Sequence, residues 1–242
     1  SLQVGSLFLL CLAALSFFFC NTGRVDKPLI DLRVFQQGKF TFSVLYLILL
    51  QFICLGIGFL LPNYSQLVMG ESALTAGCIL LPGCIIGAVL NPFTGNLLDR
   101  CGAGRPILIG TISALIGAVL FAFFITAAST GALMGIYVFF AVAQGFTVGN
   151  IMTNGLWSLP SQLNADGNAV FSTFQQLAGA VGTSAVSTLV AAAQWDQPAD
   201  LALGTRIGTQ NAFVLLLVLT ILMAICAYRA VLTKKKPGAV LK

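Results

Sequence analysis

The chain has 242 residues, of which 58% are hydrophobic and only 8% are charged, with a formal net charge of +5. Soluble domains are about 45–50% apolar and about 25% charged, so this composition argues against a soluble fold and indicates an integral membrane protein. At roughly 20 apolar residues per helix, the chain has room for about seven transmembrane helices. The apolar runs are continuous, whereas the strands of a transmembrane barrel alternate apolar and polar residues over about ten positions.

These runs predict helices, because the backbone of a segment in lipid must form its hydrogen bonds internally. In chain order they cover about 2–20, 40–62, 73–97, 106–128, 131–153, 168–193 and 211–232. We therefore expect an all-α membrane protein with four parts: a transmembrane helix over 1–20, a cytoplasmic loop over 21–39, a six-helix bundle over 40–232 and a basic cytoplasmic tail over 233–242. The chain begins at Ser1 and is apolar almost at once, without the basic segment of a signal peptide. We expect it to be a fragment that begins inside a larger protein.

The basic residues predict the orientation in the membrane, because Lys and Arg favour the cytoplasmic side. If the loops alternate between the two sides, eleven of the twelve basic residues fall on one side. Arg206 falls on the other side, in the connection expected between 193 and 211. We expect the C-terminus in the cytoplasm of a multi-pass plasma-membrane protein. The positive charge then reflects this topology and anionic lipid, and does not indicate a nucleic-acid partner.

The sequence offers little chemistry for catalysis. It contains no His and seven Cys, and no two of those cysteines form a CxxC pair. Metal sites are commonly built from His and from closely spaced Cys, and His is the commonest general base. We therefore expect no enzyme activity, no metal and no cofactor.

Four of the predicted helices carry polar or small side chains at helical spacing, whereas the helices over 2–20, 106–128 and 211–232 do not. Polar groups are costly in lipid, so these faces should point at protein or at a watery cavity. Two interpretations stay open: contacts between helices, which small and polar residues favour, and a substrate pathway. The pathway candidates are Gln51, Asn91, Thr94, Thr147, Asn150, Asn154, Gln175, Gln176 and Thr183.

Small residues and prolines predict close packing and one bent helix. Gly83 and Gly87, and likewise Gly145 and Gly149, form GxxxG patterns that favour close helix contacts. Proline removes a backbone donor and permits a kink. The helix over 73–97 should be the most bent, because it contains both Pro82 and Pro92.

The stretch "GNLLDRCGAGR" (95–105) concentrates charge between two apolar runs. It resembles the loop motif of the major facilitator superfamily, G-x-L-x-D-R-x-G-x-R, with one extra residue near Gly104. In that family the motif follows the second helix of a six-helix half, and its acid latches the cytoplasmic face to a neighbouring helix end. The resemblance implies this role for Gly95, Leu98, Asp99, Arg100, Gly102 and Arg105.

Three further stretches resemble the fourteen-span drug:proton antiporters of that superfamily: "PLIDLRVF" (28–35), "SALTAGCILLPG" (72–83) and "FQQLAGAVGTS" (174–184). The likeness implies that 40–232 is the C-terminal six-helix half and that 2–20 is a linker helix. In the family the first, second, fourth and fifth helices of each half line the cavity. Here those are the four helices already distinguished by their polar faces.

This sequence departs from the antiporters in one respect, because no Asp or Glu lies inside a predicted span. Acids that couple transport to protons would then lie in the missing half, or coupling is lost. The resemblance implies proton-coupled multidrug efflux by alternating access. The implied partners are the missing N-terminal half, a small amphipathic or cationic substrate, protons and the lipid bilayer. A facilitator for a metabolite or sugar, and a non-transporting scaffold or receptor half, are the alternatives.

Overall fold

The structure, a computed structural model, describes Ser6, Ser16 and residues 31–232. The helix expected over 2–20, the first part of the loop expected over 21–39 and the tail over 233–242 lie outside the described residues. Six described helices are long and apolar enough to cross a membrane. They confirm the all-α membrane fold expected for 40–232. The long helices in these spans are α2 (Gly38–Leu67), α4 (Leu81–Cys101), α5 (Gly104–Phe124), α6 (Thr130–Leu156), α7 (Asn164–Asp196) and α8 (Leu201–Leu232). The second span, Ala73–Leu98, also includes a short helix before α4.

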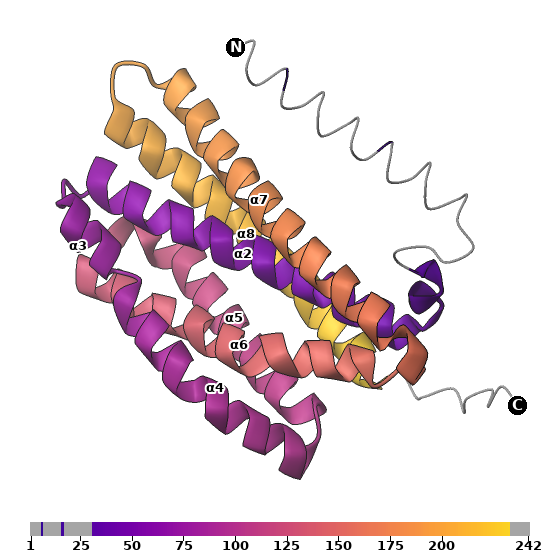
Figure 1. The fold of residues 1–242 in the computed structure, drawn as a ribbon. Helices are drawn as coiled ribbons and strands as arrows, with labels where there is room; N and C mark the ends of the chain where they lie inside the picture. The colour runs from indigo at the N-terminus through magenta and orange to yellow at the C-terminus, as the bar shows by residue number, and fades with distance from the viewer. Residues whose placement is uncertain (1–5, 7–15, 17–30, 233–242) are drawn as a thin grey trace, which may run out of the picture.

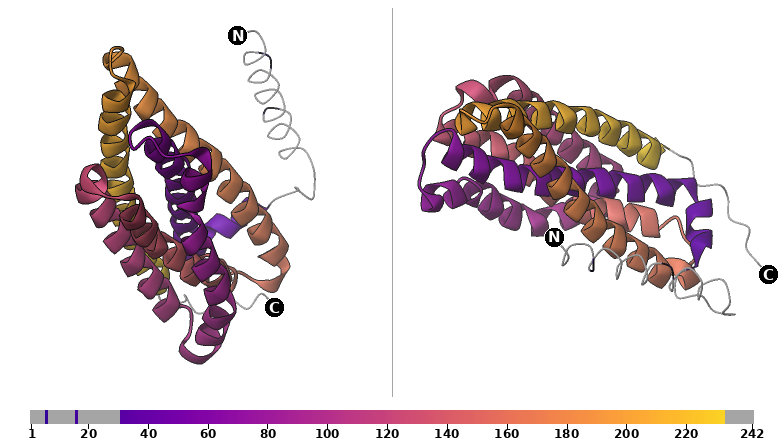
Figure 2. Two further views of the ribbon diagram at one scale, coloured as in Figure 1. Left: turned by 90° about the vertical axis from the view of Figure 1, so that its left-hand side faces the viewer. Right: turned by 90° about the horizontal axis from the view of Figure 1, so that it is seen from above.

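The helices form a bundle with α2 at its centre (Figures 1 and 2). Helix α2 packs against α6, α7 and α8, while α5 packs between α6 and α8. Helix α4 packs on α6 and lies at the edge of the bundle away from α7. The core contains the buried faces of these helices, for example Leu50 and Ile57 of α2 and Phe213 of α8. Exposed apolar side chains such as Ile112 of α5 and Val218 of α8 face outward, where lipid is the favourable environment.

The segment expected to be one bent helix over 73–97 is two helices. The short α3 (Ala73–Cys78) begins at the N-cap Ser72, whose hydroxyl accepts a hydrogen bond from the Thr75 amide at 3.1 Å. A turn at 79–80 separates α3 from α4, which has Pro82 in its first turn. Proline is tolerated there because those first amides have no partner within the helix. The second proline, Pro92, lies inside α4 without ending it.

Helix α8 begins at Leu201, earlier than the start near 211 that hydropathy predicts. Asp200 caps this helix by accepting the Leu203 amide at 2.9 Å. One face of the added turns packs closely on α7, where a Cβ built on Gly208 would lie 2.6 Å from Val190 Cα. The expectation that Arg206 lies in a connecting loop is therefore wrong. Its guanidinium projects from α8 and donates to the Thr126 carbonyl at 3.1 Å.

The segment before α2 is the short 3-10 helix η1 (Leu32–Gln36), which lies in one of the stretches that resemble the antiporters. Asp31 caps it, accepting the Arg33 amide at 2.9 Å and bonds from the Arg33 guanidinium. These hydrogen bonds hold the pKa of the Asp31 carboxyl below its ordinary value. The Phe35 ring packs edge-on against Phe174 of α7, with centroids 6.4 Å apart. This segment therefore ties the start of α2 to α7.

Candidate functional site: a polar cavity between three helices

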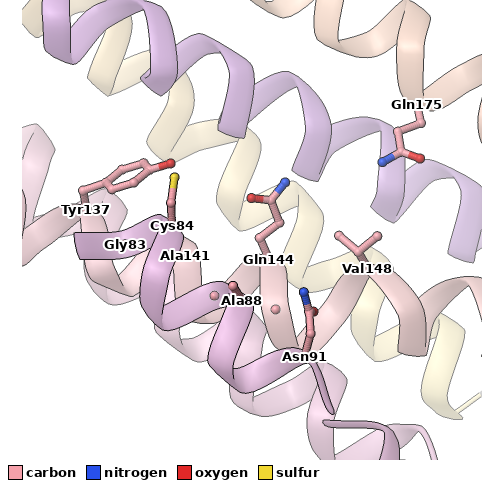
Figure 3. Close-up of a pocket in the computed structure, with 11 residues that line it drawn as sticks. Gly83, Cys84, Ala88, Asn91, Tyr137, Ala141, Gln144, Val148 and Gln175 are labelled. Carbon is pink, nitrogen blue, oxygen red and sulfur yellow. The ribbon is translucent and has the colours of Figure 1, made fainter. Parts of the chain in front are cut away.

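A cavity of about 390 Å³ opens between α4, α6 and α7 (Figure 3). Helices α4 and α6 supply most of its wall, and Gln175 of α7 faces them from the other side. The wall is formed by Gly83, Cys84, Gly87, Ala88, Asn91, Tyr137, Ala141, Gln144, Gly145, Val148 and Gln175. It is a mixed surface of small, aromatic and amide side chains.

Glycines set the close contact of α4 with α6 that builds this wall. A Cβ on Gly83 would lie 2.5 Å from Tyr137 Cδ1, so a larger residue there would displace the tyrosine ring. A Cβ on Gly145 would lie 3.4 Å from the Gly87 carbonyl oxygen. Gly83, Gly87 and Gly145 thus occupy the positions where the two helices meet, as small-residue patterns predict. Gly149 differs, because a Cβ built on it would meet no neighbouring helix of the described chain within 4 Å.

One face of α6 supplies Tyr137, Ala141, Gln144 and Val148 to the cavity. Their spacing of four, three and four residues places them on one side of a helix. Sequence reasoning missed Tyr137 and Gln144. The sequence does contain a sign of Gln144: it is a carboxamide in the middle of an apolar span. Burying a carboxamide in lipid costs free energy unless the group contacts protein or water.

Three carboxamides reach the cavity, from three different helices. Asn91 and Gln144 point from α4 and α6 into the same space, with Gln175 of α7 facing them (Figure 3). Gln175 Nε2 donates to Gln51 Oε1 of α2 at 3.3 Å. Within 31–232, no hydrogen bond engages the side-chain amide of Asn91 or Gln144. The lining residues include no Asp, Glu, Lys or Arg. The structure therefore brings the sequence candidates Asn91 and Gln175 to the same cavity. Gln51 does not line the cavity but is hydrogen-bonded to Gln175.

The other candidates on α6 lie on a different face of that helix. Asn154 Nδ2 donates to the Ala230 carbonyl of α8 at 3.3 Å and reaches Ser43 Oγ of α2 at 3.5 Å. Thr147 and Asn150 are buried, and each donates to a carbonyl of its own helix. With about 100° per residue, this face is turned on the order of 100° from the face that carries Gln144. These three side chains sit in contacts between helices and do not line the cavity.

The remaining candidates lie on α4 and α7, outside the cavity lining. Thr94 is buried and donates to the Asn91 carbonyl at 2.8 Å, and Thr183 donates to the Gly179 carbonyl at 3.1 Å. Gln176 is exposed on α7. No described contact gives these three side chains a substrate role, so that role stays a prediction.

The charged motif is mostly helical, although the sequence pattern resembles a loop. Residues 95–101 form the last turns of α4, and the turn to α5 consists of Gly102 and Ala103. Gly102 has φ +74°, a backbone conformation that residues other than glycine rarely adopt. Its amide donates to the Leu98 carbonyl at 2.8 Å, which closes the end of α4. The side chains of Asp99 and Cys101 lie outside the described part of the structure, so the latch role of Asp99 stays a prediction.

A family model described as the Major Facilitator Superfamily matches residues 3–183. The chain is 31% identical to the lincomycin resistance protein LmrB of Listeria innocua, over 88% of this chain and 47% of that protein. It is 32% identical to LmrB of Bacillus subtilis, over 84% of this chain and 44% of that protein. It is 29% identical to a multidrug resistance protein B homolog of Mycobacterium tuberculosis, over 69% of this chain and 31% of that protein. The chain therefore spans about half the length of the LmrB proteins that it matches.

Proposed function

Because the chain belongs to the major facilitator superfamily, we propose that it is the C-terminal half of a secondary multidrug efflux transporter that works by alternating access. The observation that carries the proposal is the cavity between α4, α6 and α7, with its uncharged polar wall. A six-helix half presents only one side of a central pathway. The other side comes from an N-terminal half, which is the partner that the length of the relatives supports.

The proposed substrates are small amphipathic or cationic drugs. Relatives are named for resistance to lincomycin and to multiple drugs, and we propose lincomycin as a substrate of the complete protein. A wall of amides, Tyr137 and Cys84 accepts both apolar and hydrogen-bonding parts of a ligand. Because this wall has no charged side chain, the carboxylate that would balance a cationic drug comes from the N-terminal half.

Proton coupling is also assigned to the N-terminal half. The acids among residues 31–232 lie at helix ends or in connections: Asp31, Glu71, Asp99, Asp166, Asp196 and Asp200. A proton relay needs titratable groups at membrane depth, and the lining of this cavity has no carboxylate. This half therefore contributes binding surface and moving helices to a proton-driven exporter.

The proposed orientation places the turn between α4 and α5, and the C-terminus, on the cytoplasmic side of a bacterial plasma membrane. The bias of Lys and Arg supports this orientation. In it, the motif at 95–105 latches the cytoplasmic side when that side is closed. The tight turn at Gly102 supports the proposal by holding the end of α4 next to the start of α5.

Drug accumulation in cells that make the full-length protein tests the function. A drug-sensitive bacterium is loaded with radiolabelled lincomycin or with tetraphenylphosphonium, a hydrophobic cation, with and without a protonophore. We expect lower accumulation of both drugs than in cells without the transporter, and loss of the difference when the protonophore is added. Equal accumulation in both strains would refute the efflux function. A difference that survives the protonophore would refute proton coupling.

A further inference from the structure

We propose that Asn91 and Gln144 form a neutral hydrogen-bonding subsite that binds hydroxyl and amide groups of the transported drug. This inference rests on the proposed function and goes further, because it assigns one wall of the cavity to one chemical part of the substrate. The cationic part of a drug is bound elsewhere.

Neither of these two amides has a hydrogen-bond partner among residues 31–232. A carboxamide offers two donors and one acceptor oxygen. The buried amides of α6 use these groups inside the protein: Asn150 donates to Phe146 O at 2.6 Å, and Asn154 donates to Ala230 O at 3.3 Å. Asn91 is exposed and Gln144 is half-buried at the cavity. Asn91 and Gln144 have no such bond in the part of the chain that the structure describes. Their hydrogen-bonding groups are available to whatever enters the cavity.

The two amides converge on the same cavity. They come from α4 and α6, two helices held in close contact by Gly83 and Gly145. Both side chains point into the space that Gln175 faces from α7 (Figure 3). Gln175 already donates to Gln51. The wall on the side of α4 and α6 therefore carries the amides that a ligand can engage without breaking an internal bond.

The chemistry of the two amides matches neutral polar groups of a ligand. Each carboxamide is neutral and can both donate and accept, which matches a hydroxyl or an amide and offers no balancing charge for a cation. Along α6, Gln144 lies between Tyr137, which has an apolar ring and a hydroxyl group, and the apolar Val148. This face therefore offers a hydrogen-bonding amide with apolar surface on both sides of it. Such a surface suits a ligand that carries hydroxyl or amide groups on an apolar frame.

Two probes separate this subsite from general drug binding. Lincomycin carries hydroxyl and amide groups, whereas tetraphenylphosphonium carries a charge and has no hydrogen-bonding group. The variants are Gln144→Met, which keeps the length of the side chain without its amide, and Asn91→Leu. The control is Gln66→Leu, which removes an exposed amide at the end of α2, where it bonds to its own helix. Binding of both labelled probes to the purified full-length transporter is measured by equilibrium dialysis, together with thermal melting of each variant.

We expect each cavity variant to weaken lincomycin binding about 3- to 10-fold, the range for one lost neutral hydrogen bond, and to leave tetraphenylphosphonium binding within about twofold. The control should change neither. Equal weakening of both probes with a lowered melting temperature would show that the amides hold helices together, and would overturn the subsite. Unchanged lincomycin binding in both variants would overturn it as well. If the wild-type protein bound neither probe, the proposed function itself would fail.

Discussion

Gly182 of α7 packs against the backbone of α2, and replacing it should destabilise the bundle relative to a glycine that has no such contact. A Cβ at this position would lie 2.5 Å from Phe52 O and 2.8 Å from Phe52 Cα. Both are backbone atoms, so no side chain can move aside. Ordinary contact begins at 3.4 Å, and Gly182→Ala therefore requires the two helices to separate by about 0.9 Å at this point.

The size of the effect follows from two opposing contributions. Forcing an extra methyl group into a packed contact costs about 1–3 kcal/mol. Alanine is the better helix former by about 1 kcal/mol, which offsets part of that cost. We expect a net loss of about 0–2 kcal/mol relative to the wild type, and of about 1–3 kcal/mol relative to a Gly→Ala control that gains the same helix propensity. Separation of α2 and α7 would also weaken the dispersion contacts between the two helices.

Reversible unfolding of the full-length transporter in mixed detergent measures this loss. The matched control is Gly135→Ala on α6, because a Cβ there meets no atom within 4 Å. The control should be neutral or slightly stabilising. If Gly182→Ala were as stable as the control, α2 and α7 would not be in backbone contact in the membrane, and the packing described here would be wrong.

Three further predictions follow from the orientation, the charged motif and α8. In a cysteine-free background, Gln37→Cys should react with an impermeant maleimide only in inside-out vesicles and Ala199→Cys only in intact cells; the reverse pattern would invert the orientation. Asp99→Asn should leave the protein level near normal, lower transport several-fold and raise the accessibility of Cys101; wild-type transport with unchanged accessibility would refute the latch. Arg206→Gln should lower stability by roughly 0.5–1.5 kcal/mol, because the donor to the Thr126 carbonyl is lost; an unchanged melting temperature would show that this bond contributes nothing.

Much of the fold follows from hydropathy alone, because a backbone in lipid has few alternatives to a helix. The predicted spans overlap α2, α4, α5, α6 and α7 over most of their length. The start of α8 was missed because Thr205, Arg206 and Thr209 interrupt the apolar run. Thr205 and Thr209 are buried in the helix contact with α7, and hydropathy cannot distinguish a polar residue buried between helices from one in a loop.

The site was harder to predict, for a related reason. Polar periodicity shows which face of a helix avoids lipid, and both a cavity and a helix contact satisfy that condition. On α4 the face with Asn91 meets the cavity. On α6 the conspicuous polar face, with Asn150 and Asn154, packs inside the bundle. The cavity face of α6 has a single carboxamide, Gln144, so it produced no periodic pattern.

Alkylation of Cys84 in the full-length transporter tests most directly whether this cavity lies on the drug pathway. Cys84 is exposed on the cavity wall of α4, whereas Cys78 lies on α3, outside the lining. Labelling rates with N-ethylmaleimide are measured in membranes for two variants, each retaining one of these cysteines, with and without saturating lincomycin. The account predicts that lincomycin slows labelling of Cys84 several-fold and leaves Cys78 unchanged. Equal labelling of Cys84 with and without lincomycin, in a variant that still exports the drug, would place the pathway elsewhere and contradict the account.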